Sequence, residues 1–441
     1  MIPFPEQFIS NMQKMLGDDA PAFFAAMNAS PALALRINPL RGESARAAAE
    51  PFIDGSVPWA EYGRYLRAGA RPGAGIAHAA GAFYIQEASA MISAEILKPQ
   101  PHEAILDLCA APGGKATQIA AALRGTGILA ANEPEPARAK VLCANLERMG
   151  AGGAVVTNAY PDALARCWAG FFDAVQCDAP CSGEGMFRRD PDSRAQWSSG
   201  SPAGCAKRQA EILDRAAELV RPGGRIVYST CTFNRAENED TIQAFLIRHP
   251  DFSTEDFHLD GIGDSENGML RAWPHIVRGD GHFACRLRRA GNDAMRNRAP
   301  AEIARADRAL IDPLFEICTP DLTDRKIVRA GDYLFACPAA LPEAKGVRIV
   351  SRGLCLLRIG KNYIEPAHAL AMAIDPHAAA QCMQLTDAQA VRYLSGEAIE
   401  AKTENGWTLA LWHDMPLGWG KVSGGMLKNH LPKGLRLRLH L

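Results

Sequence analysis

The middle of the chain alternates short apolar runs with longer amphipathic stretches. The runs are rich in Ile, Val, Leu and Ala and are bounded by turn residues, a pattern typical of buried strands. The predicted strands are 103–109, 127–133, 153–158, 172–178 and 224–230. The predicted helices between them are 113–125, 134–150 and 207–220. Because strand and helix alternate over residues 104–289, the sequence predicts an α/β domain whose doubly wound parallel sheet is covered by helices on both faces.

The segments on either side of this domain have different patterns. Residues 1–80 begin with an amphipathic helix at 8–16 and continue through a turn-rich basic segment at 35–43. Residues 290–308 lose the apolar periodicity, which predicts a linker. Residues 309–441 return to short strands separated by turns. We therefore expect an N-terminal α+β extension, a linker and a small β-rich C-terminal module.

The bulk composition fits a multidomain globular protein. The chain has 441 residues, of which 48% are hydrophobic and 22% charged, and a single core rarely grows to that length. No run approaches the roughly 18 apolar residues that a membrane span needs, and the first residues do not match a secretory signal. The expectation is a cytoplasmic protein without a membrane partner.

The twelve cysteines are scattered from Cys109 to Cys382 and form no disulfide framework. No CxxC occurs, and the closest pair, Cys177 and Cys181, has no histidine cluster near it, so no metal site is expected. The formal net charge of −1 means that any nucleic-acid binding must use local patches. Residues 421–441 contain five basic residues and no acid, and this segment is either a solvated surface or a binding face.

The segment "LDLCAAPGGKAT", residues 106–117, places a glycine pair and a lysine between a strand and a helix. It is not a Walker loop, because Cys109 and Ala116 stand where that loop needs glycine and a hydroxyl residue. The G-x-G-x-x-G pattern also fails, since only Gly113 and Gly114 are glycine. What remains is a tight turn whose backbone can approach a ligand closely.

The second predicted strand ends at Glu133, a position from which a carboxylate accepts hydrogen bonds from ribose hydroxyls. An acid there disfavours a ribose phosphate. The ligand is then a nucleoside with free hydroxyls, and S-adenosyl-L-methionine fits this description.

The segment "GGRIVYSTCTFNRAENED", residues 223–240, contains Cys231 between two threonines. Such a cysteine is a small buried hydrophobe, half of a disulfide, a metal ligand or a nucleophile. Asp178 and Cys181 follow the fourth strand and Cys231 follows the fifth, so all three are expected at the carboxyl edge of the sheet, beside the glycine turn.

At this cluster the sequence resembles the Sun-type RNA (cytosine-5) methyltransferase family, in particular its RsmF-like 16S ribosomal RNA subgroup. The matching motifs are "FYIQEASAM", "DLCAAPGGK", "DAPCSGEGMFRRDP", "YSTCTFNRAENE", "RAWPHIVRGDGHFACRL" and "LGWGKVSGGMLKNHLPKGLR". The resemblance implies an RNA-binding extension at 1–80, a Rossmann-like S-adenosyl-L-methionine-dependent methyltransferase domain at 81–289, and a PUA-like RNA-binding module at about 385–441. The implied partner is RNA, either 16S ribosomal RNA or the 30S subunit.

The resemblance also assigns roles to residues. Cys231 is the nucleophile that adds to carbon 6 of cytosine, Cys181 assists proton removal and product release, and Asp178 activates the ring. Asp178 also lies near the methionine end of the cofactor, Glu133 binds its ribose, and Asn158 meets its adenine edge. The remaining cofactor contacts are Cys109, Ala110, Ala111, Pro112, Gly113, Gly114 and Lys115.

Two other classes of protein compete with this assignment. One is an RNA-binding or assembly factor that kept the fold and lost catalysis, which an intact cysteine pair disfavours. The other is a methyltransferase for protein or for base amino groups, whose lone-pair nucleophiles need no cysteine.

Overall fold

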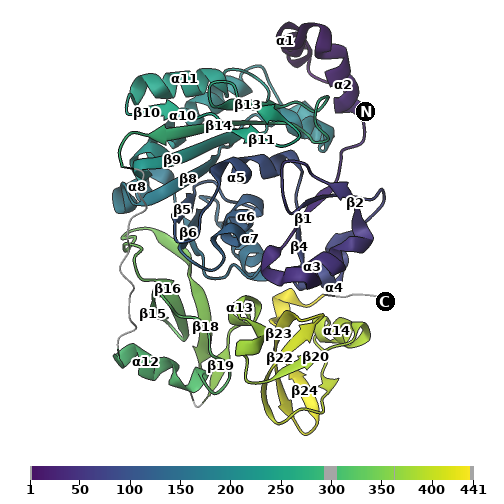
Figure 1. Cartoon of the computed structure of the whole chain (residues 1–441), viewed down its shortest axis with the longest axis vertical. Coiled ribbons are helices and arrows are strands. Elements are labelled where there is room, and N and C mark those ends of the chain that lie inside the picture. The colour runs from purple at the N-terminus through teal and green to yellow at the C-terminus, as the bar shows by residue number, and fades with distance from the viewer. Residues whose placement is uncertain (1, 293–304, 362, 438–441) are drawn as a thin grey trace.

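The computed structural model describes residues 2–292, 305–361 and 363–437, and a doubly wound sheet lies at its centre (Figure 1). The strand order is β10-β14-β9-β8-β5-β6-β7-β17, with β13 paired to β14. The five parallel strands are β5 (Ala104–Asp107), β6 (Ile128–Asn132), β7 (Val155–Asn158), β8 (Phe172–Asp178) and β9 (Val220–Thr230). Each overlaps a predicted strand, and β9 begins four residues before the predicted 224–230.

Helices cover both faces of this sheet, as the pattern predicts. One face packs on α5 (Ile92–Leu97), α6 (Gly114–Leu123) and α7 (Pro136–Arg148). The other packs on α8 (Pro161–Trp168), α10 (Ser201–Leu219) and α11 (Glu239–Arg248). Strand side chains alternate between the two clusters, because neighbouring residues of a strand point to opposite faces. Helix α10 begins six residues before the predicted helix at 207–220.

Antiparallel strands complete both edges of the sheet. On one side, β14 (His282–Arg289) pairs with β9, and β10 (Phe252–Thr254) and β13 (Met269–Ala272) pair with β14. On the other side, β17 (Arg348–Arg352) pairs with β7. Strand β17 belongs to the region expected to form only a separate β module. It instead covers the edge of β7, whose backbone groups would otherwise have no partner on that side.

The N-terminal extension has two parts. The helices α1 (Glu6–Leu16) and α2 (Ala20–Asn28) pack in an aromatic cluster with residues of the central α/β domain. A four-stranded sheet follows, made of β2 (Ile53–Ser56), β3 (Gly63–Leu66), β1 (Ala34–Ile37) and β4 (Phe83–Ile85). The segment predicted as turns at 35–43 is therefore partly a strand, with α3 (Gly42–Ala49) beginning near its end.

The C-terminal region contains two small sheets. The predicted linker at 290–308 falls largely on residues 293–304, which lie outside the described residues, and α12 (Arg305–Ile311) begins within its last part. The first sheet contains β15 (Arg325–Ala330), β16 (Tyr333–Pro338), β18 (Leu354–Ile359) and β19 (Ile364–Pro366). The second contains β20 (Cys382–Gln384), β22 (Gly406–Trp412), β23 (Met415–Ser423), β24 (Met426–Asn429) and β21 (Ile399–Glu400). Its apolar side chains share one cluster with those of the N-terminal sheet.

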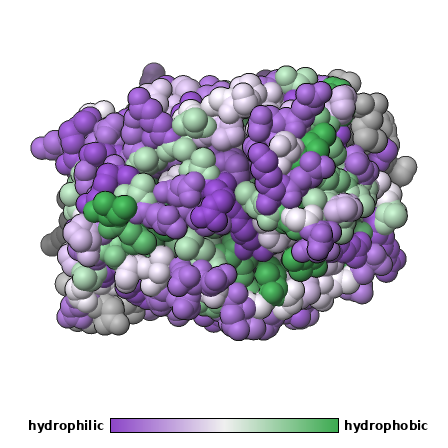
Figure 2. Space-filling view, turned by 90° about the horizontal axis from the view of Figure 1, so that it is seen from above, coloured by the Kyte–Doolittle hydropathy of each residue, from purple (hydrophilic) through white to green (hydrophobic). Residues whose placement is uncertain are grey.

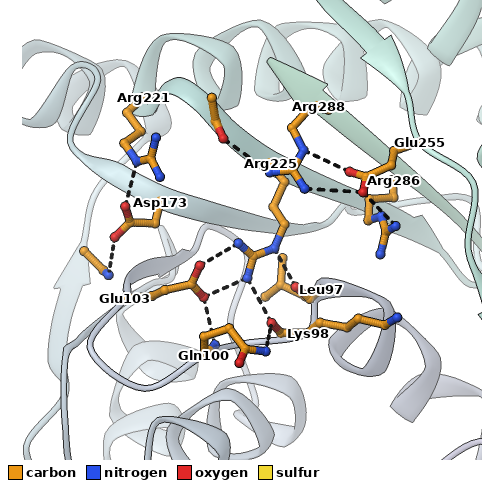
Figure 3. A network of polar contacts seen from close by, with 12 residues as sticks. Leu97, Lys98, Gln100, Glu103, Asp173, Arg221, Arg225, Glu255, Arg286 and Arg288 are labelled. Atoms are coloured by element: carbon orange, nitrogen blue, oxygen red, sulfur yellow. Dashed lines mark hydrogen bonds and ion pairs between the residues drawn. The ribbon is translucent and has the colours of Figure 1, made fainter. Parts of the chain in front are cut away.

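Buried arginines tie the sheet together at the edge where the parallel strands begin (Figure 3). Arg225 donates to both carboxylate oxygens of Glu103 at 2.6 and 2.7 Å, and to the carbonyls of Leu97 and Lys98 at the end of α5. Arg221 donates to Asp173 at 2.7 Å. These contacts link β9 to the start of β5, to β8 and to α5.

The surface is predominantly polar. Figure 2 views the molecule from the end where α1 and α11 lie in Figure 1, and apolar residues there form only small separate patches. Among the described residues, no helix is both long and apolar enough to cross a membrane.

Candidate active site

Two cysteines lie side by side at the carboxyl edge of the sheet. Cys181 lies in the loop after β8, and Cys231 directly follows β9. Because β8 and β9 are parallel neighbours, the loops that follow them meet, and the two Sγ atoms lie 3.3 Å apart. Both residues are partly buried free thiols. The structure thus brings together the predicted nucleophile and the residue predicted to assist proton removal.

These thiols open into a pocket of about 830 Å³. The predicted site residues in its wall are Cys109, Ala111, Glu133, Asp178, Cys181 and Cys231. A second cavity, of about 910 Å³, lies between residues 124–127 and the C-terminal sheets, and its lining in the described chain includes none of the predicted site residues. The pocket at the carboxyl edge is therefore the candidate active site.

Asp178, the last residue of β8, lies between a buried cation and a hydroxyl. Lys115 Nζ donates to Oδ2 at 2.7 Å, and Ser229 Oγ donates to Oδ1 at 2.8 Å. Burial favours the neutral acid, but Lys115 outweighs it and lowers the pKa of Asp178. Burial also opposes the charge of Lys115, yet the ion pair with Asp178 and the nearby Cys231 sulfur raise the pKa of Lys115. An ion pair therefore lies beside Cys231 at neutral pH.

The surroundings of Cys181 favour its protonated form. Its contact with Cys231, its burial and, more weakly, the Glu237 carboxylate raise the pKa of Cys181 well above its ordinary value. The Lys115 ammonium, in contrast, is close enough to Cys231 to interact with a charge on that sulfur. Cys181 therefore keeps its S–H proton, which can donate toward the Cys231 sulfur 3.3 Å away.

Two buried polar groups beside Asp178 are left without hydrogen-bond partners within the described structure. Neither carboxylate oxygen of Asp107, the last residue of β5, meets a well-aligned donor. Burial raises the pKa of Asp107 to about 7, and the nearby Lys115 only partly offsets this. His282 Nε2 is also unpartnered and lies 3.8 Å from Asp178 Oδ1. Burial, and then Lys115, lower the pKa of His282 to about 4, so it is neutral at pH 7.

The turn at 109–115 brings backbone close to the pocket. Gly113 has φ of 118°, a conformation that L side chains rarely adopt, and an added Cβ there would lie 3.3 Å from Leu142. Arg138, in the first turn of α7, donates to Ala111 O at 3.0 Å and lies 3.3 Å from Glu133 Oε2. Glu133 is buried, and its Oε1 accepts from the amide of Glu135 at 2.9 Å. Arg138 therefore connects the turn to the acid after β6.

Asn158 ends β7 beside the same acid, but its amide is engaged with backbone. Its Nδ2 donates to Glu133 O at 2.9 Å and to Pro134 O at 2.7 Å. The pocket wall next to it is formed by Tyr160, which is 74% exposed, and Asp162. The contact between Asn158 and adenine stays a prediction.

Several pocket residues have no clear signal in the sequence. Arg138 lies on the outer part of a helix, and Tyr160 and Met186 lie in loops or short turns. Glu237 is completely buried behind the cysteine loops, where sequence polarity predicts a surface. Among the described residues, no group of three or more His, Cys, Asp and Glu side chains could hold a metal ion.

A sheet of this order, with a glycine turn after the first parallel strand and a pocket at its carboxyl edge, defines a Rossmann-like S-adenosyl-L-methionine-dependent methyltransferase. Comparison with known families narrows this class. The family model described as 16S rRNA methyltransferase RsmB/F matches residues 94–288. Three models specific to RsmF match the rest: its N-terminal domain at 4–88, its first C-terminal domain at 314–374 and its PUA domain at 380–437.

Curated relatives agree over nearly the whole length. Ribosomal RNA small subunit methyltransferase F of Shewanella amazonensis is 33% identical over 431 residues, covering 91% of each chain. The protein of the same name from Vibrio cholerae is 30% identical and covers 98% of each. The chain therefore belongs to the RsmB/F family of 16S rRNA methyltransferases, in its RsmF branch. The family resemblance found in the sequence is confirmed.

Solved structures share the fold. A methyltransferase homolog protein from Pyrococcus horikoshii superimposes with a TM-score of 0.56 at 27% identity, covering 65% of this chain and 96% of that one. NSun6 from Pyrococcus horikoshii, crystallised with SFG, gives a TM-score of 0.56 at 20% identity and covers 66% of this chain and all of that one. These matches, together with the PUA domain, confirm the predicted fold class.

Proposed function

We propose that this protein forms 5-methylcytosine in 16S ribosomal RNA, in the cytoplasm, through a covalent bond between Cys231 and carbon 6 of the target cytosine. The observation that carries the proposal is the pair of free thiols 3.3 Å apart in the wall of a pocket that also contains Asp178. Methyl transfer to a nitrogen or oxygen lone pair requires no thiol, whereas carbon 5 of cytosine is nucleophilic only after a group has added at carbon 6.

The pocket suits S-adenosyl-L-methionine, which would supply the methyl group. Its volume of about 830 Å³ lies within the usual range for small-molecule sites. The turn at 109–115 lets backbone approach the ligand, and the Glu133 carboxylate lies where ribose hydroxyls would donate to it. The Asp178 carboxylate lines the pocket together with both thiols, and a sulfonium there would gain from its negative charge.

In the addition step, the Cys231 sulfur donates an electron pair to carbon 6, and negative charge develops toward ring nitrogen 3. Asp178 in its protonated form would donate to that nitrogen. Its ordinary state here is ionised and paired with the Lys115 ammonium at 2.7 Å, so it would take up the proton that the Cys231 thiol loses on attack and pass it to that nitrogen. Carbon 5 can then take the methyl group.

In the release step, the proton on carbon 5 leaves and the electron pair of that C–H bond expels the Cys231 thiolate. Cys181 is the group next to that sulfur. Its surroundings favour the S–H form, so it gives that proton to the leaving Cys231 sulfur 3.3 Å away, and the resulting Cys181 thiolate takes the proton from carbon 5. The two thiols therefore have different tasks in one cycle.

The RNA substrate is supported by the PUA sheet as well as by the relatives' names. Lys421 of β23 lies directly opposite Lys428 of β24, and both are exposed. Like charges in facing positions of a sheet repel unless an anion lies between them. Lys421 also lies 5.5 Å from the centre of the Trp407 ring. Phosphate contacts of this kind position RNA without reading its sequence.

Bisulfite sequencing of ribosomal RNA from cells with and without the gene tests the proposal. The account predicts at least one 16S cytosine that is protected from conversion only when the gene is present, and whose protection is restored by the wild-type chain but not by Cys231→Ala. An identical protection pattern in both cell lines would remove 16S ribosomal RNA as the substrate.

A further inference from the structure

The strongest cluster of polar groups that the catalytic steps do not use lies directly behind the two cysteines. The residue at its centre is Glu237, in the loop after Cys231, whose side chain is completely buried. We propose that Glu237 is a positioning residue that holds the Cys181 loop against Cys231, and that product release depends on it more than adduct formation does. The proposal rests on the covalent mechanism described above.

The Glu237 carboxylate is surrounded by donors from three segments. It accepts the backbone amide of Ser182 at 2.9 Å and also the Ser182 hydroxyl. Gln209, from α10, donates to Oε2 at 2.8 Å, and Asn234 donates to Oε1 at 2.6 Å. Ser182 directly follows Cys181, so two bonds of this carboxylate fix the residue next to the release cysteine. Charge-assisted hydrogen bonds are the stronger kind.

The same hydrogen-bond network also includes the residue that precedes Cys181. Gln209 Nε2, which donates to Glu237, also donates to Pro180 O at 3.1 Å. The residues before and after Cys181 are thus both connected to one buried carboxylate. Loss of that carboxylate would free the Cys181 loop at two points.

Ser182 and Asn234, which donate to Glu237, also contact the Thr232 hydroxyl next to Cys231, but Cys231 has further anchors of its own. It directly follows the central strand β9, and its carbonyl accepts from the Gly185 amide at 2.8 Å. Glu184 Oε2 accepts the amides of Phe233 and Asn234 at 2.8 and 3.0 Å. A Cβ on Gly185 would lie 2.7 Å from the Cys231 carbonyl oxygen, so the close approach at this point requires glycine. Changes at Glu237 should therefore displace Cys181 more than Cys231.

The variant Glu237→Gln keeps the size of the side chain but turns one acceptor into an amide donor that faces existing donors. Cys231 stays at the end of its strand and still adds to cytosine, whereas Cys181 is displaced and elimination slows. We expect multiple turnover to fall between about tenfold and a hundredfold, because a shift of about 1 Å has effects of that size. Single-turnover methyl transfer should change less, and the protein–RNA adduct should accumulate, as in Cys181→Ala.

A second measurement needs neither RNA nor cofactor. One thiolate adds to the N=N bond of diamide, and the second thiol then attacks that sulfur, which leaves one S–S bond and the reduced hydrazine. With diamide in large excess, the rate is set by how often the two sulfurs meet. Its product with the free protein can be followed by mass spectrometry of the peptide pair containing Cys181 and Cys231. We expect Glu237→Gln to slow this disulfide about tenfold or more. The conservative variant Glu237→Asp should recover part of the rate.

Glu103→Gln is the matched control, because it is an equally buried glutamate bound by charged groups at the opposite edge of the sheet. It should lower the unfolding temperature but leave the disulfide rate and the adduct level of the folded protein unchanged. If Glu237→Gln fails to fold, Ser182→Ala removes one donor to Glu237 and should slow the disulfide by a smaller factor.

Unchanged disulfide rates in Glu237→Gln and Ser182→Ala would overturn the positioning role. So would a Glu237→Gln protein that loses turnover without accumulating adduct. Failure of the covalent mechanism has a separate signature, which is absence of adduct in Cys181→Ala. The diamide rates still decide the role of Glu237 in that case.

Discussion

The two edges of the central sheet use buried charge in opposite ways. Where the parallel strands begin, Arg225 and Glu103 satisfy each other with two hydrogen bonds, and the remaining guanidinium donors bind carbonyls at the end of α5 (Figure 3). Where the strands end, Asp107 and His282 have buried polar atoms without partners in the described chain. The same sheet thus has one edge at which the Arg225–Glu103 pair is saturated and another edge with unused bonding capacity.

The first edge therefore contributes mainly to the stability of the fold, and the second edge contributes mainly to the chemistry. A buried ion pair with all its donors bound holds strands and helices in register, and removing one partner is costly. Buried unpartnered groups next to an ion pair and two thiols influence the charge at the pocket, at some cost to the folded state. Variants at the saturated edge should therefore affect folding, whereas variants at the carboxyl edge should affect chemistry.

The largest effect on function is expected from Cys231→Ala. Turnover should be lost completely, because Cys231 supplies the sulfur that adds to carbon 6, while the unfolding temperature should stay within a few degrees of the wild type. Methyl transfer from radiolabelled cofactor measures the turnover, and thermal denaturation measures the unfolding temperature. Residual turnover well above background would show that the thiol is not the nucleophile.

The largest effect on stability is expected from Arg225→Met. It leaves the Glu103 carboxylate buried without its cation, which typically costs about 3–5 kcal/mol. Urea denaturation measures this loss. The activity per folded molecule should be unchanged, because Arg225 lies at the edge away from the pocket. If Arg225→Met has the stability of the wild type but loses activity, the proposed division of roles between the two edges is wrong.

Asp107→Asn should change how stability depends on pH. The pKa of this carboxyl is raised from 3.8 to about 7 in the folded protein, so the unfolded chain releases the proton first. Between these values the folded state binds more protons, and its stability falls as the pH rises. The variant should remove this fall and gain about 2 kcal/mol at pH 8. This gain is below the linkage limit of about 4 kcal/mol, which follows from about 1.4 kcal/mol per pH unit over a shift of about three units. Asp260→Asn, at an exposed site, is the control for urea unfolding at pH 5 and pH 8.

The smallest effect is expected from Glu133→Ala. Losing a hydrogen bond to ribose should cost about 1 kcal/mol or more of binding free energy, which corresponds to about fivefold in the dissociation constant of S-adenosyl-L-methionine. Isothermal titration calorimetry measures this change in the dissociation constant. Unchanged affinity would remove Glu133 from the cofactor site.

The parallel strands could be predicted because they are buried on both faces and therefore read as continuous apolar runs. Strand β17 could not, since its half-buried residues give no sign that they pair with β7 from nearly 200 positions away. The start of α10 was missed because its first turns are small and polar residues, which resemble a loop. The strand at Ala34–Ile37 was hidden by the turn and basic residues that follow it.

The candidate site also has a part that the sequence predicts and a part that it does not. The meeting of Cys181 with Cys231 follows from the order of parallel strands, since loops after neighbouring strands converge. The hydrogen bonds between Glu237 and the Cys181 loop depend on which side chains face inward from irregular loops. The hydrophobic periodicity of the sequence does not predict this. Asn158 occupies the expected position, yet its amide bonds to backbone carbonyls, which only coordinates could reveal.

The most direct test of the central claim is denaturing electrophoresis of the cysteine variants after incubation with RNA and S-adenosyl-L-methionine. If Cys231 attacks and Cys181 resolves the adduct, Cys181→Ala should give a slow-migrating complex that ribonuclease removes, whereas Cys231→Ala and the double variant should give none. The opposite pattern, a stable complex with Cys231→Ala and none with Cys181→Ala, would make Cys181 the nucleophile and contradict the account.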